Sequence, residues 1–258
     1  MFYLIAGMGH CGTQWLSAFL DRPDDGMVCT HEEKFRAGVR KGILDGWMAS
    51  LMEERRSGLG ASSKAYVDQM KRRQQEIAVV GDSHSWEPFI ILTLAESLPV
   101  SKIVFMVRNG IQNVHSMHSH NTHIESGAWF YTEYLNSFAE QLGLKGLDDF
   151  GLWCAWWGAN VISAHDLEAV APVQTVRLED LTRHPMKLID LTKSLQGMAR
   201  PSVMEARGHA SVEINRKVQG RRDPDYLWST WTPNQRSTFI DVCGEAMCHY
   251  GYSIPDSA

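Results

Sequence analysis

Three glycines near the N-terminus are spaced to bind an anion. Gly7, Gly9 and Gly12 follow the apolar run 2–6, whose residues favour a buried strand. From Thr13 onward the sequence changes to the apolar spacing of a helix. A strand, a glycine turn and a helix point backbone N–H groups toward a bound anion, and glycine lets a phosphate approach the backbone closely. This stretch therefore predicts a phosphate-binding turn.

Two common types of phosphate turn fit this stretch incompletely. A Walker A turn needs a lysine directly after its second glycine, and Thr13 stands there instead. The triplet of Gly7, Gly9 and Gly12 has the spacing of a dinucleotide-binding turn. That fold also needs a second strand ending in Asp or Glu about 20 residues later, which the sequence lacks. Neither type accounts for the stretch.

Residues 26–33 contain the first candidates for proton transfer. They are typical of a short second strand that ends in a polar cluster with His31 and Glu32. Ligands of open α/β sheets bind at the carboxyl ends of the strands, so these side chains would lie near a ligand. The same residues could also begin a helix, with Thr30 as the N-cap and Glu33 completing a capping box.

A second group of candidates follows the apolar run 77–80. This run predicts a short buried strand, and Asp82, Ser83 and His84 would emerge at its carboxyl end. A helix is expected from Glu87 to about Leu98. A histidine at such a strand end can serve as a general base, although a structural role is an equal alternative.

Arg108 and Ser116 form a third group. The near-continuous apolar run 102–107 predicts a central parallel strand, and Arg108 ends it. Its guanidinium group offers a planar fork of donors to a phosphate. Ser116 would lie about two turns along the following helix, where its hydroxyl can donate to the same group.

Four histidines crowd the segment after Arg108. A zinc site is one interpretation of His115, His118, His120 and His123, but their spacing matches no standard ligand set. We therefore expect no metal. The remaining alternatives are a position beside an acceptor pocket and a solvated surface.

Several of these stretches resemble the sulfotransferases that use 3'-phosphoadenosine-5'-phosphosulfate (PAPS). The stretch 10–15, His-Cys-Gly-Thr-Gln-Trp, is similar to their Lys/Arg-Ser-Gly-Thr-Thr-Trp turn, and His84 matches the His of their Lys-Thr-His segment. Arg108 and Ser116 keep the family's spacing of eight residues. The stretch 250–252, Tyr-Gly-Tyr, is like the family's C-terminal Leu-Gly-Tyr. The resemblance spans nearly the whole chain.

The resemblance implies a fold and an activity. The fold would be a three-layer α/β arrangement, with a central, mostly parallel sheet flanked by helices as in P-loop NTPases. Residues 1–258 would form a single sulfotransferase domain, in which the polar, helical stretch 34–76 could be a lid or an insertion. The activity would be transfer of the sulfuryl group of PAPS to a hydroxyl or amine of a small-molecule acceptor, with PAP as the product.

The resemblance also implies how PAPS is held. The glycine turn would bind the 5'-phosphate through backbone N–H groups, helped by two side chains, and an indole ring would stack on adenine. The arginine and serine pair would bind the 3'-phosphate, helped by cations of the basic stretch 215–222. The residues implied are Gly9, His10, Cys11, Gly12, Thr13, Gln14, Trp15, Arg108, Ser116, Lys217 and Arg221.

Catalysis in this family needs a base and a donor. A base removes a proton from the acceptor while the acceptor attacks sulfur, and His84 is our first choice, with Glu32 the second. His31 or Asp82 would orient that base. Charge develops on the sulfuryl oxygens and the leaving phosphate, and fixed donors must stabilise it. The family places Lys or Arg at position 10, where His10 would act protonated or as a neutral N–H donor.

Composition limits the partners. The 258 residues carry a net charge of −5, with a pI of about 6.1, which argues against broad binding of nucleic acid or an anionic membrane. The five cysteines are odd in number and form no CxxC pair, so we expect reduced thiols in a cytoplasmic protein. The first apolar run is too short for a signal peptide or membrane span. The expected partner is a small-molecule acceptor, and a homodimer is left open.

Two other classes of protein remain. One is a nucleotide-dependent kinase or another P-loop enzyme, which the absence of a Walker lysine disfavours. The other is a catalytically silent module that keeps a PAP pocket. The departures from the family pattern at His10, Asp82 and Gly110 motivate this second alternative.

Overall fold

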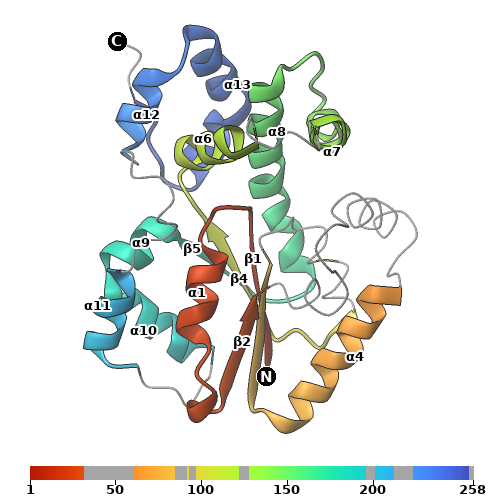
Figure 1. Ribbon diagram of the computed structural model, residues 1–258, viewed down its shortest axis with the longest axis vertical. Coiled ribbons are helices and arrows are strands. Elements are labelled where there is room, and N and C mark those ends of the chain that lie inside the picture. The colour runs from red at the N-terminus through yellow and green to blue at the C-terminus, as the bar shows by residue number, and fades with distance from the viewer. Residues whose placement is uncertain are drawn as a thin grey trace. The chain divides into compact units, whose positions relative to one another are not determined.

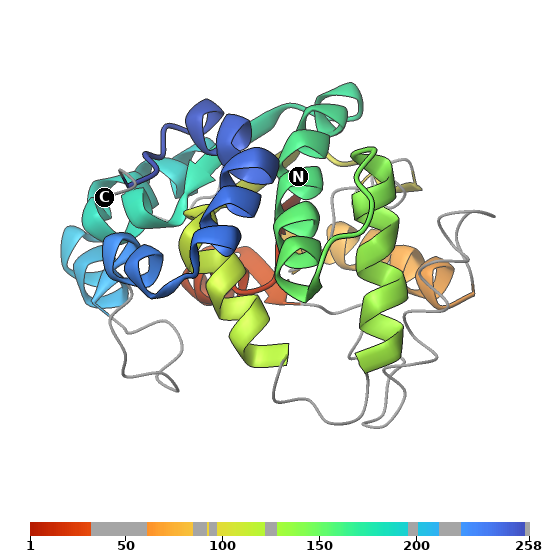
Figure 2. The same ribbon diagram turned by 90° about the horizontal axis from the view of Figure 1, so that it is seen from above.

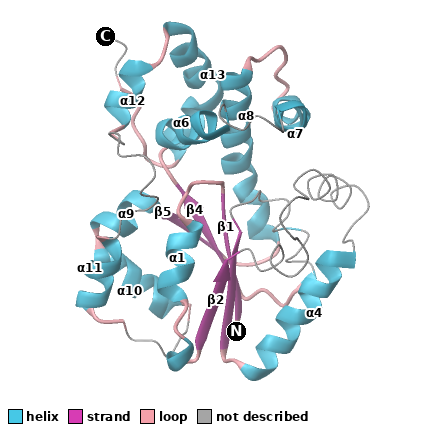
Figure 3. Ribbon diagram, in the orientation of Figure 1, coloured by secondary structure: helices cyan, strands magenta, loops and turns pink. Residues whose placement is uncertain are grey.

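The chain divides into two compact units. The computed structural model describes residues 1–31, 61–84, 92, 97–121, 128–195, 201–211 and 223–255. Residues 1–106 and 164–214 form one unit, here called the sheet unit, and residues 107–163 and 215–258 form the other, the helical unit. The strands belong to the first and long helices build the second (Figure 3).

The sheet unit is built on parallel strands. The strands are β1 (Phe2–Gly7), β2 (Met27–His31), β3 (Val79–His84), β4 (Lys102–Val107) and β5 (Val173–Arg177). Their order in the sheet is β2-β3-β1-β4-β5, and β1 runs parallel to both β3 and β4. All six residues of β1 are buried, as its uninterrupted apolar sequence predicts for a central strand.

Helices cover both faces of this sheet. They are α1 (Thr13–Leu20), α4 (Ala61–Glu76), α9 (Leu178–Arg183), α10 (Pro185–Ser194) and α11 (Val203–Ala210). In Figure 1, α4 lies on one side of the strands and the other four helices lie on the opposite side. Tyr3 and Ile5 of β1 pack in a core with residues of α1, α9, α10 and α11. The α/β class predicted from the sequence is confirmed.

The third strand differs from its prediction. We expected a strand at 77–80 with Asp82 and His84 beyond its end, whereas β3 runs from Val79 to His84 and includes both. The reason is that β3 lies between two partners. Asp82 pairs with Leu4 of β1 on one side and with Thr30 of β2 on the other, so the ladder continues past the apolar run.

Two other predictions fall largely outside the described residues. The helix predicted from Glu87 to Leu98 is described only at residues 92, 97 and 98. Of the segment predicted as a lid, residues 34–60 lie outside the described part of the chain, and residues 61–76 form α4.

The helical unit packs around one central helix. Its helices are α6 (Gly110–Asn121), α7 (Ala128–Gln141), α8 (Asp149–Ile162), α12 (Pro224–Thr230) and α13 (Pro233–His249). Helix α8 contacts α6, α7 and α13, which surround it in Figure 2. The side chain of Asp148 accepts the Gly151 N–H and caps α8, and Trp157 of α8 packs on Phe239 of α13. None of the described helices is long and apolar enough to cross a membrane.

Candidate functional site

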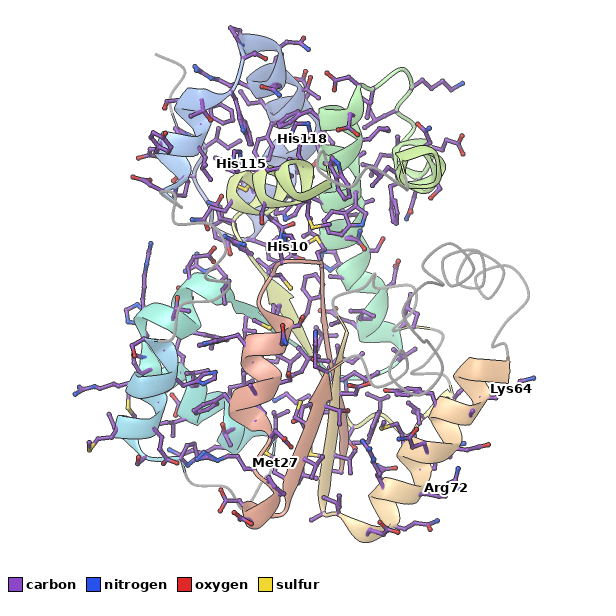
Figure 4. All side chains as sticks on the ribbon, in the orientation of Figure 1. His10, Met27, Lys64, Arg72, His115 and His118 are labelled. Atoms are coloured by element: carbon purple, nitrogen blue, oxygen red, sulfur yellow. The ribbon has the colours of Figure 1, made fainter. Side chains whose placement is uncertain are left out.

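The glycine turn follows β1 directly. Gly12 has a φ of +94°, and a Cβ on Gly7 would lie 2.5 Å from the Sγ of Cys11, so both positions need glycine. His10, at the bend labelled in Figure 4, also has a left-handed backbone, with a φ of 62°. Such a conformation in a residue other than glycine costs energy and is concentrated at functional sites.

The turn uses one of the predicted phosphate donors internally. The Cys11 N–H donates to the Met8 carbonyl at 3.2 Å, and the Cys11 side chain is buried in the core. Cys11 therefore shapes the turn. A bound phosphate would draw on the other backbone groups of the stretch.

The first turn of α1 supplies such groups. The N–H of Leu16 is bonded to the Gly12 carbonyl, so the N–H groups of residues 13–15 precede the helix ladder. They carry the positive end of the helix dipole, and the first turn contains no acidic residue. Thr13 is 3% exposed, whereas Gln14 is exposed. This end of α1 favours an anion.

Trp15 packs against a second helix. Its ring was expected to stack on adenine, but the residue is only 6% exposed and stacks on the ring of His209 at a centroid distance of 4.7 Å. The indole Nε1 also donates to the His209 carbonyl at 3.1 Å. The structure therefore places Trp15 in the contact between α1 and α11, and the stacking of its ring on adenine stays a prediction.

Replacing Gly12 with alanine is expected to destabilise the protein. The change strains a φ of +94° and places a Cβ 2.8 Å from Cδ1 of Leu178. We expect a loss of about 2 to 3 kcal/mol in the free energy of unfolding, measured in urea. Gly143→Ala is the matched control, because its φ is +71° but a Cβ would meet nothing within 4 Å. An equal loss in both variants would contradict a role for Leu178.

The strand ends bring the candidate proton-transfer residues to one edge of the sheet. His84 pairs with Ala6, one residue before Gly7, and His31 pairs with Ser83. The His31 Nδ1 and the Ser83 Oγ are 2.7 Å apart. His31, His84 and the glycine turn therefore lie at the carboxyl ends of three neighbouring strands. Glu32, the next residue after His31, lies outside the described residues, as does the His84 side chain.

Asp82 accepts several hydrogen bonds at this edge of the sheet. It is 0% exposed, and its two carboxylate oxygens accept hydrogen bonds from the Thr30 hydroxyl at 2.9 Å and the Tyr66 hydroxyl at 2.7 Å. The Ser83 N–H donates to it as well. These bonds join β2, β3 and α4. Asp82 therefore has a structural role in the sheet. Its role in orienting the base stays a prediction.

Arg108 and Ser116 belong to the helical unit. Arg108 directly follows β4, and Ser116 lies on α6; both are half-buried. Asn109 caps that helix, because its Oδ1 accepts the N–H of Ile111 at 3.0 Å. Lys217 and Arg221, also predicted to bind PAPS, lie outside the described residues.

The helical unit explains the glycine at position 110. The Gly110 N–H donates to the Met247 Sδ at 3.3 Å, a bond that a proline could not make. A Cβ on Gly110 would lie 3.0 to 3.1 Å from Met247, Phe239 and Trp157. The packing of this unit therefore favours glycine at position 110.

His115 and His118 both lie on α6 (Figure 4). The His118 Nε2 is 3.4 Å from the Asp149 Oδ2. Burial lowers the pKa of His115, and the neighbouring His118 lowers it further. The described ranges contain no group of three His, Cys, Asp or Glu side chains able to hold a metal. The His120 side chain and His123 lie outside those ranges.

Sequence reasoning missed three residues that support these elements. Asn109 before a helical glycine is a typical N-cap pattern and could have been found. Tyr66 and His209 gave no local signal, because their partners, Asp82 and Trp15, are distant in the sequence.

Comparison with solved structures identifies the fold. The sulfotransferase domain from the curacin biosynthetic pathway matches with a TM-score of 0.56 and 16% identity over 98% of each chain. The sulfotransferase domain of the Synechococcus PCC 7002 olefin synthase matches with a TM-score of 0.54 and 17% identity, over 98% of this chain and 95% of that chain. Mouse sulfotransferase SULT7A1, complexed with PAP, matches with a TM-score of 0.53 and 15% identity, over 96% and 84%.

These matches show that the chain has the sulfotransferase fold. No protein-family model and no curated protein matches its sequence.

Proposed function

We propose that this protein is a sulfotransferase that moves the sulfuryl group of PAPS to a hydroxyl or amine of a small-molecule acceptor. The observation that carries the proposal is the register of the sheet. It sets His84 opposite Ala6, so a candidate base lies beside the start of the glycine turn. An anion held by that turn would thus be next to a group able to accept a proton.

The glycine turn is proposed to hold the 5'-phosphate of PAPS. The supporting features are the N–H groups of residues 13–15, the left-handed backbone at Gly12 and the absence of acidic residues in the first turn of α1. Gln14 is exposed beside these groups and can add a side-chain donor. His10 is proposed to donate to the sulfuryl oxygens as charge builds there.

Arg108 and Ser116 are proposed to bind the 3'-phosphate. The support is their spacing together with the Asn109 cap, which fixes the start of α6 and hence the place of Ser116 on it. Arginine suits this task because its guanidinium group can donate two parallel hydrogen bonds to a phosphate. Lys217 and Arg221 are proposed as additional cations, and this part of the proposal rests on the sequence alone.

The proposed reaction is an in-line displacement at sulfur. His84 takes the proton from the acceptor hydroxyl or amine, and the freed electron pair forms the new bond to sulfur. The bond between sulfur and the bridging phosphate oxygen breaks, and PAP leaves with that electron pair. Glu32 is the second candidate for the base. Asp82, two residues before His84 in β3, is the candidate to orient it, because residues two apart in a strand share one face of the sheet.

Titration calorimetry with PAP, ATP and NAD tests the proposed ligand. We expect PAP to bind at least tenfold more tightly than ATP or NAD, because only PAP presents phosphates at both positions. Arg108→Ala should weaken PAP binding by about 10- to 100-fold, the usual effect of losing a charge-assisted hydrogen bond. Arg183→Ala, which removes an exposed arginine of α9, is the control and should bind as the wild type does.

Two results would count against the proposal. Equal binding of ATP and PAP would favour a kinase-like P-loop enzyme. Tight PAP binding without turnover of PAPS on a broad acceptor panel would favour the silent PAP-binding module. Turnover that needs an acceptor hydroxyl or amine would support the sulfotransferase.

A further inference from the structure

The contact between α1 and α11 is reciprocal. Trp15, the third residue of α1, donates from its indole Nε1 to the His209 carbonyl at 3.1 Å. The His209 Nε2 is 2.8 Å from the Trp15 carbonyl, and the two rings stack at an angle of 29°. We call these two hydrogen bonds and the ring stack the Trp15–His209 clasp.

The chemistry of the clasp defines the state of the imidazole. A carbonyl oxygen only accepts hydrogen bonds, so the His209 Nε2 must carry a hydrogen. Burial lowers the pKa of His209, and its hydrogen bond to the Trp15 carbonyl partly offsets this. Phe19 packs on the ring at a centroid distance of 5.0 Å. The nearby charges of Arg22 and Glu205 pair with each other.

The clasp joins the turn that would hold a phosphate to a second helix. The His209 carbonyl is among the last four of α11, where the regular helix ladder leaves acceptors open. The indole therefore bonds to a carbonyl in the last turn of α11, which also accepts the Ser211 N–H. In return, the imidazole bonds to the carbonyl of Trp15, whose own N–H is one of the open donors of α1. Each helix end is thus held by a side chain of the other.

The position of the clasp indicates a role beyond general packing. A second tie, between Arg22 and Glu205, already joins the chain after α1 to the start of α11. That tie acts at the far end of α1. The clasp acts at the anion-binding end, where small displacements of the N–H groups would change the bonds made to a phosphate.

We infer that the Trp15–His209 clasp is a positioning device, which holds the first turn of α1 in the geometry that binds the 5'-phosphate. This inference rests on the proposed function. His209 itself touches no substrate in this assignment. It acts through Trp15.

Three variants test the inference. His209→Ala removes the clasp, and His209→Gln keeps a donor that can reach the Trp15 carbonyl. Met204→Ala, at an exposed position of the same helix, is the control. PAP affinity is measured by calorimetry, and the exchange of the amide hydrogens of residues 16–19, the first that are bonded within α1, is measured in the ligand-free protein.

A positioning role predicts a distinct set of results. His209→Ala should bind PAP at least tenfold more weakly, with amide exchange at residues 16–19 at least tenfold faster. His209→Gln should recover PAP affinity to within about threefold of the wild type. Met204→Ala should match the wild type in both measurements. If His209 contributed only packing, His209→Gln would not recover the PAP affinity.

The outcomes separate this inference from the proposed function. If the wild type fails to bind PAP, the proposed function is wrong, and the exchange measurement alone decides whether the clasp holds the turn. If the wild type binds PAP and His209→Ala binds it equally well, the clasp has no positioning role. Should His209→Ala fail to fold, Trp15→Phe is tested in its place. This change removes the indole donor but keeps an aromatic ring that can stack on His209. Weaker PAP binding by this variant supports the inference, and unchanged binding overturns it.

Discussion

Replacing His84 with alanine is expected to lower the rate of sulfuryl transfer by about 10²- to 10⁴-fold, the usual contribution of a general base. The position of His84 at the end of β3, opposite Ala6 of β1, is the reason for choosing it over Glu32. The binding of PAP should stay within about twofold of the wild type, because the base acts on the acceptor. The rate is measured as the initial velocity with PAPS and an acceptor that the wild type sulfonates. The binding of PAP is measured by calorimetry.

The control variants make this test selective. His184→Ala removes an exposed histidine of the same unit and should keep the wild-type rate. Added imidazole should partly restore the rate of His84→Ala, since a free base can occupy the vacated space. If Glu32→Gln loses more activity than His84→Ala, and imidazole restores nothing, Glu32 is the base and our assignment is wrong.

Replacing Gly81 with alanine is expected to unfold much of the protein. A Cβ at this position would lie 2.1 Å from Cζ of Tyr3, whose ring is fully buried on the neighbouring strand. Residue 81 pairs directly with Tyr3 in the middle of the sheet, so neither strand can shift without breaking the ladder. We expect a loss of about 3 kcal/mol or more, at the upper end of the range for overpacked cores. Urea unfolding followed by circular dichroism measures it.

A control and a rescue check the cause of this loss. Gly208→Ala places a Cβ on α11 where nothing lies within 4 Å, so stability should rise by up to about 1 kcal/mol from helix propensity. Tyr3→Leu in the Gly81→Ala background removes the ring atoms that clash. The double variant should be more stable than the two single losses together predict. Strict additivity would refute the steric explanation.

The sequence by itself determined the central strands and the glycine turn between β1 and α1. β1 and β4 are apolar along nearly their whole length, and such runs are typical of strands buried on both faces of a parallel sheet. Glycine at position 12 permits a backbone conformation that other residues rarely adopt, and the structure shows a φ of +94° there. These signals are local, because each depends on residues that are adjacent in the chain.

Only the tertiary structure decided the roles of residues whose partners are distant. Asp82 looked like a partner of a catalytic base, yet it binds Thr30 and Tyr66, because β3 has a strand on each side and α4 above it. Trp15 looked like a platform for adenine, yet it is clasped by His209 from 194 residues away. A side chain's role depends on what folding places against it. The sequence sets where such residues stand along a strand or helix, and packing across elements selects their partners.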